Sequence, residues 1–238
     1  MNHKAFGGLA LVGTLFWLGS AQAGVLIDSS AGVKALAGAD LWSTPSNVPE
    51  GQLFGFAGSA AGLSYGALGY YELRLIKFVG LEVDLAYQHG SFHRKLTVNQ
   101  IAEFTETANV NSLRLPILAK LNIPMGVGRF WLGLGPEFTL YQSSSFKLEQ
   151  TGGPSTPVPG STHTRNVKPT YGTLGVGFVL EIPLIGIDIP IELRASKNLA
   201  QPGDWDERMS VDRGAATATL RAESSWVLRL GAGVGIRF

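Results

Sequence analysis

Phe130–Tyr141, with the sequence FWLGLGPEFTLY, alternates between an apolar side and a side of small and polar residues. The even positions include Phe130, Leu132, Leu134, Phe138 and Leu140, and the odd positions include Trp131, Gly133, Gly135, Glu137 and Thr139. Because successive side chains of a β-strand point to opposite faces, this period of two predicts a strand. The segment is longer than the roughly 5–6 residues of a typical soluble strand. It is long enough for a tilted membrane-spanning strand, which needs about 9–11 residues.

The same alternation recurs on both sides of this segment. The predicted strands are residues 33–42, 63–75, 81–88, 113–122, 130–141, 174–182, 187–194 and 226–238. The connections alternate between long and short, and the long ones are residues 43–60, 91–107, 142–168 and 197–217. Short turns on one side and long loops on the other are typical of transmembrane barrels. The sequence therefore predicts an all-β fold, an eight-stranded antiparallel up-and-down transmembrane β-barrel.

The composition fits a chain whose broad surface does not face water. Of 238 residues, 45% are hydrophobic and only 16% are charged, whereas a typical soluble domain has about 25% charged residues. The absence of cysteine excludes disulfides, thiolate metal sites and a catalytic thiol. A formal net charge of +1 argues against nucleic-acid binding.

The first 23 residues have the features of a secretory signal peptide. Lys4 supplies a positive charge, residues 5–18 are apolar, and Ala21 and Ala23 form the small-x-small pattern that precedes cleavage. The apolar run is shorter than the roughly 20 residues of a membrane-spanning helix. We expect residues 1–23 to be removed and residues 24–238 to form one outer-membrane β-barrel domain.

The direction in which the apolar faces point decides between a membrane barrel and a soluble one. A lipocalin-like periplasmic carrier would place apolar side chains inside, and a membrane barrel would place them outside. Aromatic residues lie near the ends of the predicted apolar faces, as expected for interfacial girdles: Tyr71, Tyr87, Phe130, Phe138, Trp226 and Phe238. The membrane barrel is therefore favoured, and the soluble carrier remains as an alternative.

The sequence ends GVGIRF, residues 233–238, and this ending resembles the signal by which outer-membrane barrels are recognised for insertion. Phe238 is the terminal aromatic residue, Ile236 is the hydrophobic residue two positions before it, and Gly233 is the glycine five positions before it. The resemblance implies that the barrel assembly machinery is a partner of the chain.

The sequence is also similar to the small outer-membrane β-barrel domain family of bacterial envelope proteins, with its porin-like and PorT-like barrels. The resemblance rests on Leu73–Tyr87 as a hairpin, on Leu113–Asn122 followed by Pro124, on Gly133–Pro136 and on Phe238. It covers nearly the whole predicted mature chain and implies an eight-stranded barrel in the bacterial outer membrane. These patterns specify a fold rather than an activity.

The charged residues of the predicted strands share the side opposite the apolar face. The inner set is Glu72, Arg74, Glu82, Asp84, Arg114, Lys120, Glu137, Glu181, Asp188, Glu192, Arg194 and Arg229. An eight-stranded barrel is just wide enough to be filled by side chains, and buried charges are tolerated when they are paired. We therefore expect a salt-bridge network that fills the lumen, with a solute pathway as the alternative.

The candidate chemistry is sparse. His89 and His93 are about 13 Å apart on an extended chain, too far to share one metal. His89 and Ser91 share a strand face and could act as base and nucleophile with Glu103 or Glu106 as the acid. Small outer-membrane lipid A deacylases use such a triad, so a lipid A-modifying enzyme is the alternative function. The favoured prediction is a protein without enzyme activity, metal or cofactor.

The favoured role is structural or interactive. The expected partners are outer-membrane lipid and an extracellular ligand bound by the loops 43–60, 91–107, 142–168 and 197–217, and the expected state is a monomer. Pro116, Pro136 and Pro190 lie inside predicted strands. Because proline cannot donate to a strand ladder, bulges or strand ends are expected near them.

Overall fold

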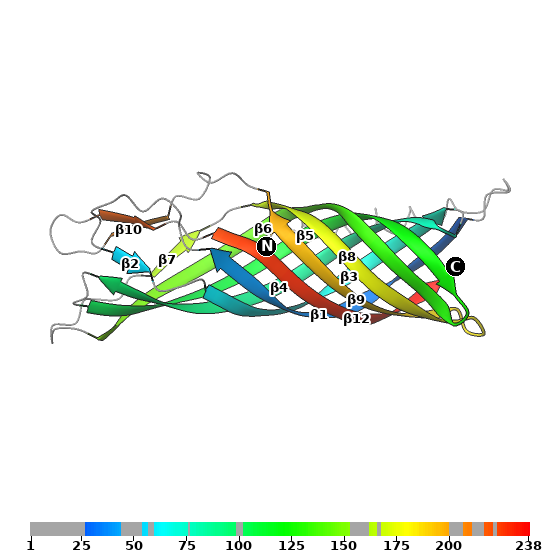
Figure 1. Cartoon of the computed structure of the whole chain (residues 1–238), viewed down its shortest axis with the longest axis horizontal. Coiled ribbons are helices and arrows are strands. Elements are labelled where there is room, and N and C mark those ends of the chain that lie inside the picture. The colour runs from blue at the N-terminus through cyan, green and yellow to red at the C-terminus, as the bar shows by residue number, and fades with distance from the viewer. Residues whose placement is uncertain are drawn as a thin grey trace, which may run out of the picture.

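A computed structural model describes the part of the chain that forms the predicted barrel (Figure 1). The described residues are 27–43, 54–56, 60–75, 77–98, 102–152, 162–165, 168–199, 207–210, 217–220 and 223–238. The predicted signal peptide, residues 1–23, lies outside them. Within the described ranges, no helix has the length and apolar character needed to cross a membrane.

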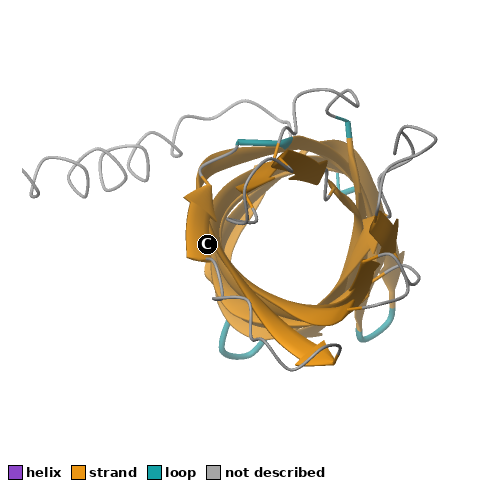
Figure 2. Cartoon of the chain, turned by 90° about the vertical axis from the view of Figure 1, so that its left-hand side faces the viewer, coloured by secondary structure: helices purple, strands orange, loops and turns teal. Residues whose placement is uncertain are grey.

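Eight long strands build the barrel. They are β1 (Ile27–Ser43), β3 (Ala60–Leu75), β4 (Val79–Val98), β5 (Ala102–Met125), β6 (Gly128–Gly152), β8 (Thr170–Ile182), β9 (Ile187–Asn198) and β12 (Glu223–Arg237). Each pairs antiparallel with the next, and β1 pairs with both β3 and β12, which closes the ring (Figure 2). The predicted fold, an eight-stranded antiparallel up-and-down barrel, is confirmed.

Apolar side chains cover the outside of this barrel, and charged side chains point inward. In β6, Leu134 on the outer face is 63% exposed, whereas Trp131 and Glu137 on the inner face are fully buried. The same alternation of exposed and buried positions runs along β8 and β9. An apolar exterior around a polar interior is the arrangement of an outer-membrane β-barrel. The alternative of a soluble carrier with an apolar interior is therefore wrong.

Three strands continue well beyond their predicted ends. β4 extends to Val98, β5 begins at Ala102, and the two pair continuously from Ser91↔Asn109 to Val98↔Ala102. The predicted loop 91–107 is therefore mostly a strand hairpin, and the first part of the predicted loop 142–168 belongs to β6. The reason for the error is that the outer face of this extension is polar, so the pattern used for the other strands stops.

Four short strands lie in or near the remaining predicted loops. β2 (Phe54–Phe56) pairs with the end of β4, and β7 (Thr162–Arg165) pairs with β6. β10 (Glu207–Ser210) and β11 (Thr217–Leu220) pair only with each other among the described strands. The loops 43–60, 142–168 and 197–217 thus contain strand segments. Figure 1 shows these segments at one end of the barrel, the end towards which β4–β6 extend.

The outer face changes from apolar to polar between two neighbouring rows of β4, β5 and β6. The register places Tyr87, Leu113 and Tyr141 in one row. The next row contains His89, Asn111 and Ser143. The outer faces of all three strands thus become polar at one level, while inside the barrel Phe92 and Val110 are buried just beyond it. We call this level the girdle boundary.

Pro116 in β5, Pro136 in β6 and Pro190 in β9 lie within strands rather than at strand ends. The continuous pairing of β5 with β4, of β6 with β5 and of β9 with β12 is interrupted beside them. A register shift between Leu113 and Arg114 also lies close to Pro116. These interruptions follow from the missing N–H of proline, which removes a ladder hydrogen bond.

Candidate functional site in the barrel lumen

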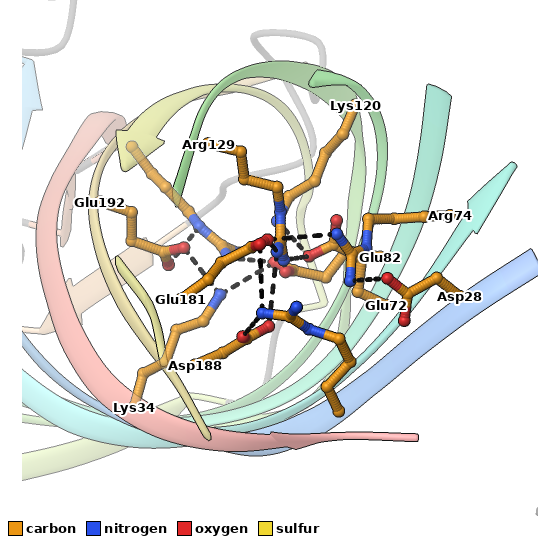
Figure 3. Close-up of polar contacts among 12 residues, drawn as sticks. Asp28, Lys34, Glu72, Arg74, Glu82, Lys120, Arg129, Glu181, Asp188 and Glu192 are labelled. Carbon is orange, nitrogen blue, oxygen red and sulfur yellow. Dashed lines mark hydrogen bonds and ion pairs between the residues drawn. The ribbon is translucent and has the colours of Figure 1, made fainter. Parts of the chain in front are cut away.

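The twelve charged residues expected in the lumen all lie on the inner face of the barrel. Eleven of them are buried, and the Glu181 side chain is 21% exposed. They come from β3, β4, β5, β6, β8, β9 and β12, and Figure 3 shows how part of the set converges near the barrel axis. The strand period explains this convergence, because every second side chain of each strand points inward.

Glu82 of β4 lies at the centre of the larger cluster of charges. Its carboxylate accepts hydrogen bonds from Lys34 at 3.0 Å, from Arg194 at 2.7 Å and from Lys120. The Glu82 side chain is 1% exposed, and the three cations come from β1, β9 and β5. One acid therefore joins strands from opposite sides of the barrel.

The same cations bind further acids. Lys34 donates to Glu192 at 2.7 Å, and Arg194 forms ion pairs with Glu192 and Asp84. Glu72 accepts from Lys120 at 3.4 Å and from Arg129 at 3.2 Å. The paired charges thus form one connected network rather than separate ion pairs.

This network continues to the end of the barrel that carries the short turns. Arg129, Arg74 and Arg237 all pair with Glu181. Arg129 and Arg237 also pair with Asp188, and Arg74 pairs with Asp28, whose side chain is 38% exposed. Figure 3 shows Asp28 and Arg74 at the edge of the cluster.

A second cluster surrounds Glu137, which is fully buried. Arg114 donates to Glu137 at 3.0 Å, and Arg229 donates to its other oxygen. Thr173 and Ser196 donate to the same second oxygen at 2.9 and 3.1 Å. Four donors from four strands therefore satisfy one buried carboxylate, as buried polar groups require.

Five charged residues of the lumen were not in the predicted set. They are Asp28, Lys34, Asp40, Arg129 and Arg237. Lys34 and Asp40 share the inner parity of the predicted strand 33–42, but the buried Leu36 has that parity too and obscured the pattern. Arg129 and Asp28 precede the predicted starts of their strands. Arg237 was on the predicted polar face of the last strand, where its parity could have identified it.

Glycines on the inner wall make room for large aromatic rings. Trp131 is fully buried, and the Lys120 ammonium lies 4.0 Å from its ring centre. A Cβ atom at Gly175 would lie 2.9 Å from the Trp131 ring, and one at Gly177 would lie 2.6 Å from its Nε1. Tyr70 is likewise covered by Lys34, at 4.4 Å. The cations thus contact aromatic faces as well as carboxylates.

The predicted metal and catalytic residues lie on the outer face near the girdle boundary. His89 Nδ1 is 2.8 Å from Asn111 Oδ1, and His93 Nδ1 is 3.0 Å from Thr107 Oγ1. Each histidine thus has its own partner, and the described residues contain no cluster of metal-ligating side chains.

The predicted acids of the catalytic triad do not reach Ser91. Ser91 pairs opposite Asn109, whereas Glu106 pairs opposite Arg94 and Glu103 opposite Thr97. These positions are about 10 and 20 Å farther along the ladder at roughly 3.4 Å per residue. The choice of Glu103 or Glu106 is therefore wrong. Asn111, which sequence reasoning missed, is the residue that contacts His89.

The residues of the expected insertion signal lie on or next to β12. Ile236 and Phe238 are 63% and 56% exposed, and Gly233 is half-buried. The Phe238 N–H donates to the Ser29 carbonyl at 3.0 Å, and the Ser29 N–H donates back at 3.2 Å. The apolar side chains at this end of β12 therefore face the surroundings of the barrel, while its backbone is paired with β1.

Comparison with known proteins finds similarity in structure only. No family model matches the chain, and no curated protein matches it in sequence. The attachment invasion locus protein Ail of Yersinia pestis is 11% identical, with a TM-score of 0.38, over 89% of this chain and 98% of that one.

Two further solved structures have similar values. The outer membrane protease OmpT of Escherichia coli is 9% identical, with a TM-score of 0.41, over 91% of this chain and 99% of that one. A major outer membrane protein of Thermus thermophilus is 14% identical, with a TM-score of 0.41, over 88% and 99%. At these values, the outer-membrane fold of the chain rests on its own strand pairing and its apolar exterior.

Proposed function

We propose that this outer-membrane barrel is a closed, non-conducting membrane anchor that presents its extended strands and loops outside the membrane. The observation that carries the proposal is the ionic network, because side chains from all eight strands meet inside the barrel. Lipid would surround the apolar exterior, and the chain would act as a monomer without cofactor.

The charges of the lumen are nearly balanced. The described inward cations are Lys34, Arg74, Arg114, Lys120, Arg129, Arg194, Arg229 and Arg237. The described inward acids are Asp28, Asp40, Glu72, Glu82, Asp84, Glu137, Glu181, Asp188 and Glu192. Desolvated charges are tolerated when each is paired and hydrogen-bonded. This balance supports a structural role for the network over a selective pathway for ions of one sign.

The extension of β4–β6 supports an interaction role on the extracellular side. Its outer face presents exposed His93, Lys95, Glu103, Lys147 and Glu149. Both signs of charge are present, and Lys147 pairs with Glu149. A mixed polar face on a paired sheet is suited to a polar ligand or partner, which would bind there and at the loops.

The purified barrel should carry no stable current when it is inserted into a planar lipid bilayer. The physical reason is that the connected ion pairs fill the interior of a barrel that is already narrow. Single-channel recording in concentrated salt tests this, with protein-free bilayers as the control. Insertion is verified independently by the protease resistance of the inserted protein. A stable, sizeable current from verified insertions would contradict the closed-anchor proposal.

A second candidate function, an esterase that acts on outer-leaflet lipid, is favoured by the contact between His89 and Asn111. Asn111 Oδ1 accepts a hydrogen bond from the Tyr87 hydroxyl at 3.1 Å and is an acceptor for His89 Nδ1 as well. The proton of a neutral His89 therefore lies on Nδ1, which leaves the Nε2 lone pair free to act as a base. Ser91 is two residues along on the same outer face.

This second candidate predicts that Ser91→Ala abolishes the release of ester-linked fatty acid from lipid A, and that Asn111→Ala lowers it. Loss of a positioned base or nucleophile costs about 100-fold or more. Ser145→Ala is the matched control, because Ser145 lies on the same outer row as Ser91. No release by the wild type, or equal release by the Ser91 variant, ends the esterase candidate.

A further inference from the structure

Gly80 differs from the other inner-wall glycines in what surrounds it. Gly175 and Gly177 lie against the ring of Trp131, and Gly235 lies against Tyr70. A Cβ atom at Gly80 would instead have two polar side-chain atoms and a carbonyl as its nearest neighbours. Its glycine is therefore not explained by the volume of an aromatic ring.

Three polar atoms converge on this position from two adjacent strands. The Cβ position of Gly80 is 3.0 Å from Asn122 Nδ2, 3.3 Å from Glu72 Oε1 and 3.5 Å from the Leu73 carbonyl oxygen. The residues come from β5 for Asn122 and from β3 for Glu72 and Leu73. We call the space bounded by these atoms the Gly80 notch.

The side chains at the notch are buried, and the described residues leave them with unmet hydrogen bonds. Asn122 is fully buried, and neither of its amide atoms has a hydrogen-bond partner within the described part of the chain. Glu72 is 1% exposed, and its Oε2 binds Lys120 and Arg129, whereas its Oε1 has no partner there. Buried polar atoms without partners are rare in native structures because they cost free energy.

We propose that the Gly80 notch is a binding site for one structural water molecule. A molecule in the notch must accept a hydrogen bond from Asn122 Nδ2 and donate to Glu72 Oε1, with the Leu73 carbonyl as a second acceptor. Water has two donors and two acceptor sites and can meet all three requirements at once. An alkali cation cannot accept from the amide N–H, and an ammonium ion cannot accept either.

This water would complete the coordination of Glu72. Oε2 of Glu72 is already shared by two cations, so the bound water would supply the donor that Oε1 lacks. It would also link Asn122 to the ionic network, to which no described side chain connects it. Gly80 is therefore a positioning element of the lumen that acts through a bound water.

Two substitutions that share the same Cβ atom test the proposal. Gly80→Ala would displace the water without replacing its hydrogen bonds, and the unfolding equilibrium constant should rise about tenfold. Gly80→Ser should recover much of this loss, because its hydroxyl can accept from Asn122 and donate to Glu72. Urea unfolding of the full chain in lipid vesicles measures both variants.

The contrasting outcomes are distinct. An apolar notch without water predicts that Gly80→Ala stabilises the barrel, because alanine restricts the unfolded chain. A simple steric clash of the Cβ atom predicts that serine is at least as harmful as alanine. A stability of the wild type that depends on Na⁺ or K⁺ at constant ionic strength would identify a cation in place of water. Each of these three results overturns the proposal, and a high-resolution structure with one ordered water beside Gly80 supports it.

Discussion

Glu82→Gln should destabilise the barrel by about 3–5 kcal/mol, the range for breaking a buried ion pair by removing one partner. The substitution leaves Lys34, Lys120 and Arg194 without the acid that they share. Glutamine retains the size of the side chain, so the lost charge is the main change. Urea unfolding in lipid vesicles, followed by tryptophan fluorescence, gives the free energy of unfolding.

Glu149→Gln is the matched control for this experiment. Glu149 also forms an ion pair, with Lys147, but the two side chains are 55% and 60% exposed. Exposed pairs contribute about 0–1 kcal/mol, so this variant should behave like the wild type. Removing one cation as well, in Glu82→Gln/Lys120→Met, should recover part of the loss because fewer buried charges remain unpaired. Equal stability of the Glu82 and Glu149 variants would contradict the structural role of the network.

Gly175→Val should destabilise the barrel by about 3 kcal/mol, the upper part of the usual range for overpacking a core. Valine is a good strand former, so strand propensity alone predicts the opposite sign. The cost arises because the Cβ position of Gly175 is 2.9 Å from two ring atoms of Trp131, while its next contact, with Arg194, is at 3.5 Å. The same unfolding assay measures the effect.

A second background separates the ring contact from a general effect of valine. In a Trp131→Leu protein the ring is absent, so adding Gly175→Val should cost far less than it does in the wild type. Gly126→Ala controls for glycine replacement in general, because nothing lies within 4 Å of its Cβ position. If Gly175→Val cost the same in both backgrounds, the glycine would have a purpose other than housing Trp131.

The strand period predicts the barrel well because it follows directly from side-chain direction. Segments such as Phe130–Tyr141 alternate so regularly that both the strand and its outward face follow from the sequence. The inner positions of the twelve predicted charges follow from the same parity. Only the ends of the strands were misplaced, because β4–β6 change the polarity of their outer face while the backbone continues to pair.

Contacts between strands were harder to predict than positions within one strand. Parity placed Ser91 and His89 on one face, but the register of β4 with β5 decides which residue of β5 meets them. That register brings Asn111 opposite His89 and moves Glu103 far from Ser91. In the same way, parity places Glu82 inside the barrel, whereas its three cations come from strands whose relative stagger the sequence does not encode locally.

The girdle boundary also fixes how deeply the protein is immersed. A vertical displacement by one row, or about 7 Å of strand, would place His89 and Asn111 in hydrocarbon or Tyr87 in water. Both changes are unfavourable, so the barrel has one preferred height in the bilayer. Because β4–β6 cross this level without interruption, a partner that binds their outer ends would be held at a constant distance from the lipid surface.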